Sequence, residues 1–198
     1  LFAEGQGGYA NPLSIVAAAF FEPVHAIGFL HWATMVVGGG GVFCLCRILG
    51  ISGWSATFAA IAVVFSSAWI SNQHDLPAFV TLAWIPWLIA AAEYWVKQPS
   101  LRRAAILAIP AALLVFAGYP QMTHGTVLYV LASMLAQLFR QDTRDEFARR
   151  WHIILVSGIL AVILAIGLAA IQFLPLMELV GQSYRQHGIQ QIYNFGMP

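Results

Sequence analysis

The chain has 198 residues, of which 60% are hydrophobic and 9% are charged, and its formal net charge at pH 7 is +1. So small a share of charged side chains cannot cover the surface of a water-soluble domain of this size, and the composition therefore favours a protein embedded in lipid. The basic residues form no stripe interleaved with stacking aromatic side chains, which argues against a nucleic-acid partner.

The first part of the chain, residues 1–23, predicts an outward loop followed by a short apolar segment. Residues 1–12 are polar and glycine-rich, and neither a start Met nor the basic and apolar regions of a signal peptide precede them. We therefore expect an interior piece of a longer membrane protein. Residues 13–23 are apolar but too short to span a bilayer, so they form either an interfacial helix or the frayed lead-in to the first span.

The apolar segments that follow, over residues 24–174, predict about six membrane-spanning helices of about 17 to 25 residues each. They lie at residues 24–48, 54–71, 76–96, 101–117, 120–139 and 152–174. The expected fold is an all-α polytopic transmembrane helical bundle with a short interfacial helix. We expect one transmembrane domain over residues 1–198, with residues 175–198 as an outward C-terminal segment.

The first span contains four consecutive glycines at residues 38–41 and two histidines, His25 and His31. Each glycine costs a helix in water about 1 kcal/mol, but in a membrane small residues let neighbouring helices approach closely, so packing is favoured over a hinge. A histidine within a span can serve as a metal or tetrapyrrole ligand. A hydrogen bond between helices is the commoner use.

Two short connections predict tight outward turns. Residues 71–75 join the second and third predicted spans, and residues 118–120 join the fourth and fifth. Pro120 suits the first turn of a helix, where its missing N–H would be unpaired in any case. Both turns place polar side chains at the outer surface.

The distribution of basic residues sets the expected orientation. All of them except Arg185 fall on one alternating set of loops, at Arg47, Lys97, Arg102, Arg103, Arg140, Arg144, Arg149 and Arg150. Because cytoplasmic loops retain Lys and Arg during insertion, these loops face the cytoplasm. The expected location is the bacterial inner membrane, crossed several times, with both ends of this chain extracytoplasmic.

Several polar side chains then share the outward ends of different helices. Besides Glu4, they are Asn11, Gln73, His74, Asp75, Tyr119, Gln121, His124, Gln172 and Glu178. Such a set could supply hydrogen-bond donors to a phosphate and a carboxylate that accepts a proton.

Each of these groups also has a plainer interpretation. His74 and Asp75 form either a functional pair or a hydrophilic turn, although His is tunable near neutral pH. Gln121 and His124 share a helix face, and bonding to neighbouring backbone is favoured over ligand contact. Glu178 follows Pro175, which should end or kink the last helix; it is either a functional acid at membrane depth or a solvated carboxylate.

Short motifs in a fixed order carry a resemblance that spans nearly the whole chain. They are Asn11-Pro12, residues 46–52, Phe65-Ser66-Ser67 before Gln73-His74, residues 82–87, Gly118-Tyr119-Pro120-Gln121 and residues 170–179. In this order they resemble the bacterial YfhO-type membrane proteins, which are similar to the GT-C class of polytopic glycosyltransferases. The family has Gly-His where this chain has Gln73-His74, and His-Pro-Gln where this chain has Tyr119-Pro120-Gln121.

The resemblance implies transfer of a sugar from a polyprenyl-phosphate carrier on the outer face of the membrane. It places a catalytic acid in the first outward loop, in a stretch expected before Leu1, with Glu4 as the acidic candidate in this sequence. The other polar residues would then bind the substrate. Membrane lipids and other membrane subunits would be partners. The identity of any cofactor is left open, with a divalent cation as one option. The alternative function is a non-catalytic scaffold subunit that contacts lipids or pigments. A transporter is weaker, because no pair of interrupted helices carries charges at the midplane.

Overall fold

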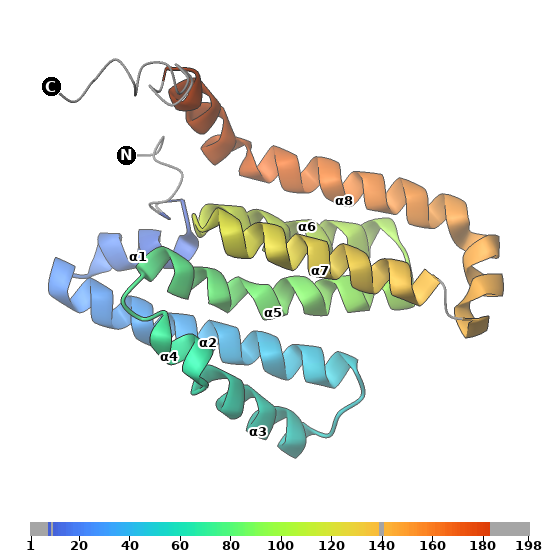
Figure 1. Ribbon diagram of the computed structural model, residues 1–198, viewed down its shortest axis with the longest axis horizontal. Coiled ribbons are helices and arrows are strands. Elements are labelled where there is room, and N and C mark those ends of the chain that lie inside the picture. The colour runs from blue at the N-terminus through green and yellow to red at the C-terminus, as the bar shows by residue number, and fades with distance from the viewer. Residues whose placement is uncertain (1–7, 9, 139–140, 183–198) are drawn as a thin grey trace, which may run out of the picture.

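The computed structural model describes residues 8, 10–138 and 141–182, and over these residues the regular structure is entirely helical. The helices are α1 (Pro12–Phe20), α2 (Pro23–Ile48), α3 (Gly53–Val64), α4 (Ser67–Ser71), α5 (Leu76–Lys97), α6 (Leu101–Phe116), α7 (Pro120–Leu138) and α8 (Gln141–Gln182). The long helices lie roughly side by side and alternate in direction along the chain (Figure 1). This confirms the all-α class.

Four segments are long and apolar enough to cross a membrane: Pro23–Ile48, Gly53–Ser71, Leu76–Lys97 and Trp151–Gln172. The predicted count of about six is not confirmed. Helix α6 has 16 residues, which at 1.5 Å per residue gives about 24 Å, less than a typical hydrocarbon core. Helix α7 is longer, at 19 residues, but its first turn carries polar side chains.

The second predicted span, residues 54–71, is one apolar segment but two helices. Helix α3 ends at Val64, and α4 begins at Ser67. At the break, the Phe65 N–H donates to Ile61 O at 3.1 Å and the Ser66 N–H donates to Val63 O at 3.0 Å. Because these turn bonds satisfy the backbone, the chain can change direction inside an apolar segment at little cost.

Helix α1 is separate from α2, which argues against the interpretation of residues 13–23 as a frayed lead-in to the first span. Asn11 caps it, with Oδ1 accepting from the Leu13 N–H at 3.0 Å, and Phe21 ends it in extended backbone before α2 begins at Pro23. The segment is therefore no frayed extension of the first span. Pro12 and Pro23 each begin a helix, where a missing N–H costs least.

The four glycines of α2 confirm the packing interpretation. A Cβ built on Gly38 would lie 2.0 Å from the Trp69 ring, and one on Gly41 would lie 2.8 Å from the Trp87 ring. The Trp87 indole also donates to Val37 O at 2.8 Å. The glycines thus make room for two tryptophans, one from α4 and one from α5.

Helix α8 packs mainly on α6 through small side chains. Ala104 and Ala108 of α6 and Ser157 and Ala161 of α8 are all buried, and the Trp95 indole donates to Ser157 Oγ at 3.1 Å. Such small-residue stripes are typical of helix contacts in lipid. Contrary to one predicted outcome, α8 does not end at Pro175 but continues to Gln182, and its ribbon bends toward the C-terminal end (Figure 1).

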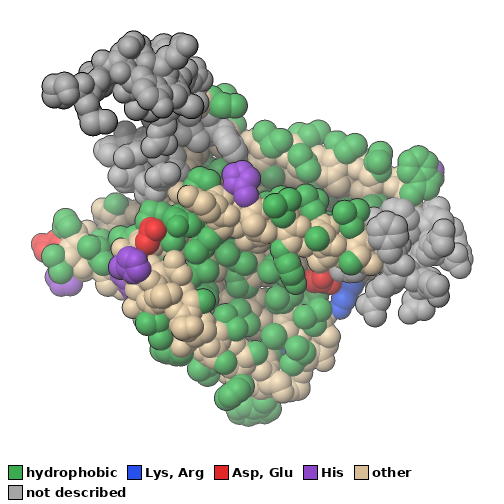
Figure 2. Space-filling view, in the orientation of Figure 1, with side chains coloured by type: hydrophobic (Ala, Val, Ile, Leu, Met, Phe, Trp, Pro, Cys, Tyr) green, Lys and Arg blue, Asp and Glu red, His purple; other side chains and the backbone are tan. Residues whose placement is uncertain are grey.

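Large hydrophobic side chains cover much of the outside of the bundle. Phe58 is 75% exposed, Leu128 66% and Ile163 60%. Figure 2 shows hydrophobic groups spread over the middle of one face, with charged and histidine side chains toward its ends. An apolar surface of this extent is typical of contact with lipid, and the structure therefore supports a multi-pass membrane protein.

Candidate functional site

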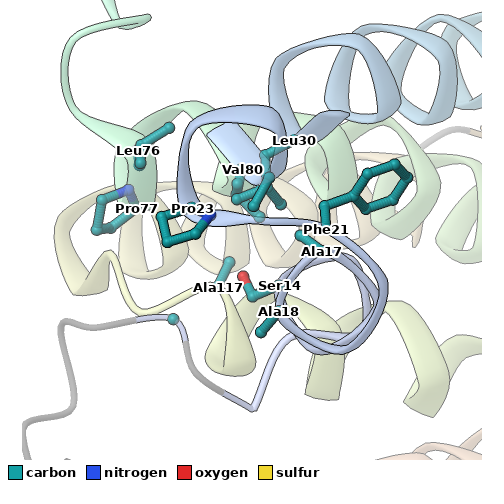
Figure 3. A pocket seen from close by; sticks show the side chains of 12 residues that line it. Ser14, Ala17, Ala18, Phe21, Pro23, Leu30, Leu76, Pro77, Val80 and Ala117 are labelled. Carbon is teal, nitrogen blue, oxygen red and sulfur yellow. The ribbon is translucent and has the colours of Figure 1, made fainter. Parts of the chain in front are cut away.

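A pocket of about 650 Å³ lies where α2 and α5 begin and α6 ends, and we call this end of the bundle the pocket end. Helix α1 forms one wall of the pocket (Figure 3). The lining residues are Gly8, Ser14, Ala17, Ala18, Phe21, Pro23, Ala26, Leu30, Leu76, Pro77, Val80 and Ala117. The volume is in the range of small-molecule sites.

The chemistry of the lining is apolar. Among the described residues of the lining, Ser14 carries the only polar side chain, and none of them is charged. An apolar cavity offers water too few partners and favours hydrocarbon. The pocket can therefore hold an acyl or isoprenoid chain, but the part of its wall that the structure describes supplies no acid or base.

The turn between α4 and α5 brings polar groups to the pocket end. Gln73, His74 and Asp75 come directly before the lining residues Leu76 and Pro77. Asp75 caps α5, with Oδ1 accepting from the Ala78 N–H at 3.4 Å, while His74 is exposed. The cap uses one acceptor position of the Asp75 carboxylate through a long bond. This turn therefore carries a helix cap, Asp75, beside two further polar side chains, Gln73 and His74.

The turn between α6 and α7 lies at the same end. Gly118 adopts a φ of +81°, which suits glycine, and the partly buried Tyr119 follows the lining residue Ala117 by two positions. His124 Nδ1 lies 2.6 Å from Pro120 O, so the predicted bonding to neighbouring backbone is confirmed for His124. Gln121 is exposed.

Asn11 is fully buried, although it was predicted to face the outer surface. Its Oδ1 caps α1, and its Nδ2 is buried without a hydrogen-bond partner. The side chain holds the helix that forms a wall of the pocket, and it is absent from the lining itself. Its observed role is therefore to position α1.

Two further predicted residues, Gln172 and Glu178, are not among the described residues that line the pocket. Gln172 is 6% exposed and Glu178 is exposed, both on the part of α8 that runs toward the pocket end (Figure 1). Glu4 lies outside the described residues. In the part of the chain that the structure describes, no group of three or more His, Cys, Asp or Glu side chains comes together to hold a metal ion.

His31 links α2 to the first polar turn, so the hydrogen bond predicted between helices is found between a helix and a turn. Its Nε2 lies 3.0 Å from Gln73 O and its Nδ1 lies 2.8 Å from Ile27 O. The ring also packs on Phe79 of α5, with centroids 5.1 Å apart. His25, six positions earlier, is exposed.

The opposite end of the bundle, where α2 and α5 end and α6 begins, gathers basic side chains, and we call it the basic end. Arg47 donates to Ile51 O at 2.8 Å, and Lys97 donates to Ile48 O. Arg103 donates to Tyr94 O at 2.7 Å and stacks over the Tyr94 ring at 3.8 Å. The bonds of Lys97 and Arg103 satisfy carbonyl groups near helix C-termini, as cations there commonly do.

Sequence reasoning missed the pocket, because its lining comes from three separate helices, α1, α2 and α5, together with Ala117 just after the end of α6. Two signals were present: the alanine-rich α1, and prolines at the starts of α1, α2 and α5. Comparisons with protein-family models, with curated proteins and with solved structures find no match to this chain. The site must therefore be interpreted from its own geometry.

Proposed function

We propose that this chain is part of a GT-C-like membrane glycosyltransferase that acts on a polyprenyl-phosphate-linked sugar at its pocket end. The observation that carries the proposal is the position of the apolar pocket beside two polar turns. A lipid-linked sugar has the same two parts: a hydrocarbon chain that avoids water and a charged headgroup that needs hydrogen-bond donors.

The chain would lie in the pocket and the headgroup at the turns. Leu76 and Pro77 line the pocket directly after Asp75, so a carrier seated there would bring its phosphate to the region of Gln73 and His74. Amide and imidazole donors suit a phosphate. In this proposal the pocket end faces outward, as the alternation of basic loops predicts.

The proton-accepting group for the sugar acceptor is proposed to come from the first outward loop, with Glu4 as the candidate in this sequence. The described pocket walls carry no carboxylate. A transfer reaction needs a base within hydrogen-bond reach of the acceptor hydroxyl. This division gives the described helices the binding role and the loop the chemistry.

The apolar lining also favours a second candidate, a non-catalytic subunit that binds a lipid in the same pocket and scaffolds other membrane subunits. Such a protein needs the pocket but no base. The two candidates differ in turnover and agree in lipid binding.

The test is sugar transfer by the full-length protein in lipid vesicles supplied with a labelled polyprenyl-phosphate sugar and envelope acceptors. Ala18→Trp would fill the pocket from α1, where Ala18 lines it. We expect a rise in KM of at least roughly tenfold, since most of the chain contact is lost. Val16→Trp is the matched control, because Val16 is on the same helix, 39% exposed and outside the lining.

Three results separate the candidates. A rise in KM for sugar transfer that is confined to Ala18→Trp supports the enzyme. Lipid binding without transfer by the unaltered protein supports the scaffold. Equal behaviour of both variants would contradict a functional pocket in either case.

A further inference from the structure

The turn that carries Gln73, His74 and Asp75 is fastened to the rest of the bundle by a histidine with two carbonyl neighbours. Within the turn, the Asp75 N–H donates to Asn72 O at 3.0 Å and Asn72 Nδ2 donates to Ala68 O at 2.7 Å. These bonds are local. Among the described residues, the hydrogen bond that reaches the turn from another long helix is the contact of His31 Nε2 with Gln73 O.

Both ring nitrogens of His31 face a carbonyl oxygen, at 2.8 Å for Ile27 and 3.0 Å for Gln73. A carbonyl oxygen only accepts, whereas a neutral imidazole has one N–H and one lone pair. The neutral ring can therefore bond to only one of these oxygens and turns a lone pair toward the other. The protonated ring donates to both, and such charge-assisted bonds are the stronger ones.

From this geometry we infer that His31 is a positioning residue, a latch whose proton holds the α4–α5 turn against α2, next to the lining residues Leu76 and Pro77. Protonation favours the latched turn, and loss of the proton as the pH rises loosens it. The latch stands on the His31 geometry alone. Its consequence for substrate binding rests on the proposed function.

The surroundings of His31 leave few other groups to answer a pH change. On α2 the neighbouring ionisable residues are Glu22 and His25, both exposed; on the turn they are His74 and Asp75. From α5, the ring of Phe79 faces His31 and does not titrate. Helices α1 and α4 carry no ionisable side chain.

The test is amide hydrogen exchange of the full-length protein in lipid nanodiscs over about pH 5 to pH 8, the range in which histidines change charge. Protection factors, corrected for the intrinsic pH dependence of exchange, are compared for peptides covering residues 69–80. We expect protection in the unaltered protein to fall roughly fivefold as the pH rises, the effect of one lost hydrogen bond. Peptides covering residues 118–130 should not change.

Variants assign the effect to one side chain. His31→Gln keeps a donor that does not titrate, so protection should stay high at every pH; His31→Leu removes the donor, so protection should stay low. His25→Gln and His74→Gln should keep the pH dependence of the unaltered protein. Persistence of the pH dependence in His31→Gln, or its loss in His74→Gln, would overturn the latch. Because exchange needs no turnover, a protein without transferase activity still tests it, and failure of the latch leaves the transfer assay intact.

Discussion

The two ends of the bundle close their helices in different ways. At the basic end, Lys97 and Arg103 reach carbonyl oxygens near the ends of neighbouring helices, and Arg47 reaches Ile51 O in the connection that follows its own helix. At the pocket end, the helices are held by short caps such as those of Asn11 and Asp75, and a cavity remains between them. The basic end is therefore closed by bonds between its helices, whereas the pocket end has room for a ligand.

In the orientation that we propose, the basic end faces the cytoplasm and the pocket end faces outward. This orientation follows from the tendency of cytoplasmic loops to retain Lys and Arg during insertion. The pocket end would then meet lipid-linked substrates at the outer face. Between the two ends lies the layer of glycine and tryptophan, which keeps α2 against α4 and α5.

The largest effect should come from breaking that middle layer, because both ends depend on it. Gly38→Val would place atoms where the Trp69 ring now lies, since even a Cβ would come within 2.0 Å of it. We expect a loss of about 3 kcal/mol in the free energy of unfolding, the upper part of the range for overpacking. Chemical unfolding in detergent micelles measures it.

Gly28→Val is the matched control for this change. Gly28 is on the same helix, and a Cβ built there meets nothing within 4 Å. Its expected effect is within about 0.5 kcal/mol of zero, because Val is a slightly better helix former than Gly. Equal losses for the two variants would show that the glycine layer does not have the observed packing.

A smaller effect should come from the basic end. Arg103→Ala removes the bond to Tyr94 O, the bond to Gln98 Oε1 at 2.8 Å and the stacking on the Tyr94 ring. We expect a loss of about 1 kcal/mol, because these contacts are partly exposed to water. The control is Arg102→Ala, an exposed neighbour, which should leave the unfolding midpoint unchanged. A reversed order would contradict the assignment of stability to Arg103.

The smallest effect should come from the pocket end. Asp75→Ala removes the cap of α5, whose bond is long at 3.4 Å. We expect a loss of about 0.5 kcal/mol, the lower limit for such a cap. Asp75→Asn keeps a capping oxygen and should recover most of it in the same unfolding titration. A loss larger than that of Arg103→Ala would reverse the contrast between the two ends.

The sequence predicted the class of the fold, most of the helices and the alternation of their ends, because hydrophobic runs and turn residues act locally. It predicted the role of the glycines but not their partners, since Trp69 and Trp87 are far away in the chain. The break at Phe65 and Ser66 was missed because residues 54–71 together have the length and composition of one span. The predicted count of about six spans is not confirmed, because α6 is short for a span.

The site was harder to predict, because a pocket is what packing leaves unfilled. Polar residues such as His74 and Tyr119 could be assigned to one end from loop order alone. Asn11 looked equally suitable, yet it is buried as a cap. Burial depends on contacts between distant helices, and no local pattern around Asn11 reports them.

The inward side of α2 follows a seven-residue repeat. His31, Thr34, Gly38 and Gly41 are spaced three, four and three apart, so they share one stripe of the helix. Deleting a single residue between His31 and Gly38 would rotate one relative to the other by about 100°. Gly38 and Gly41 could then no longer face Trp69 and Trp87 while His31 faces Gln73. The fold therefore requires the length of this stretch as well as its composition.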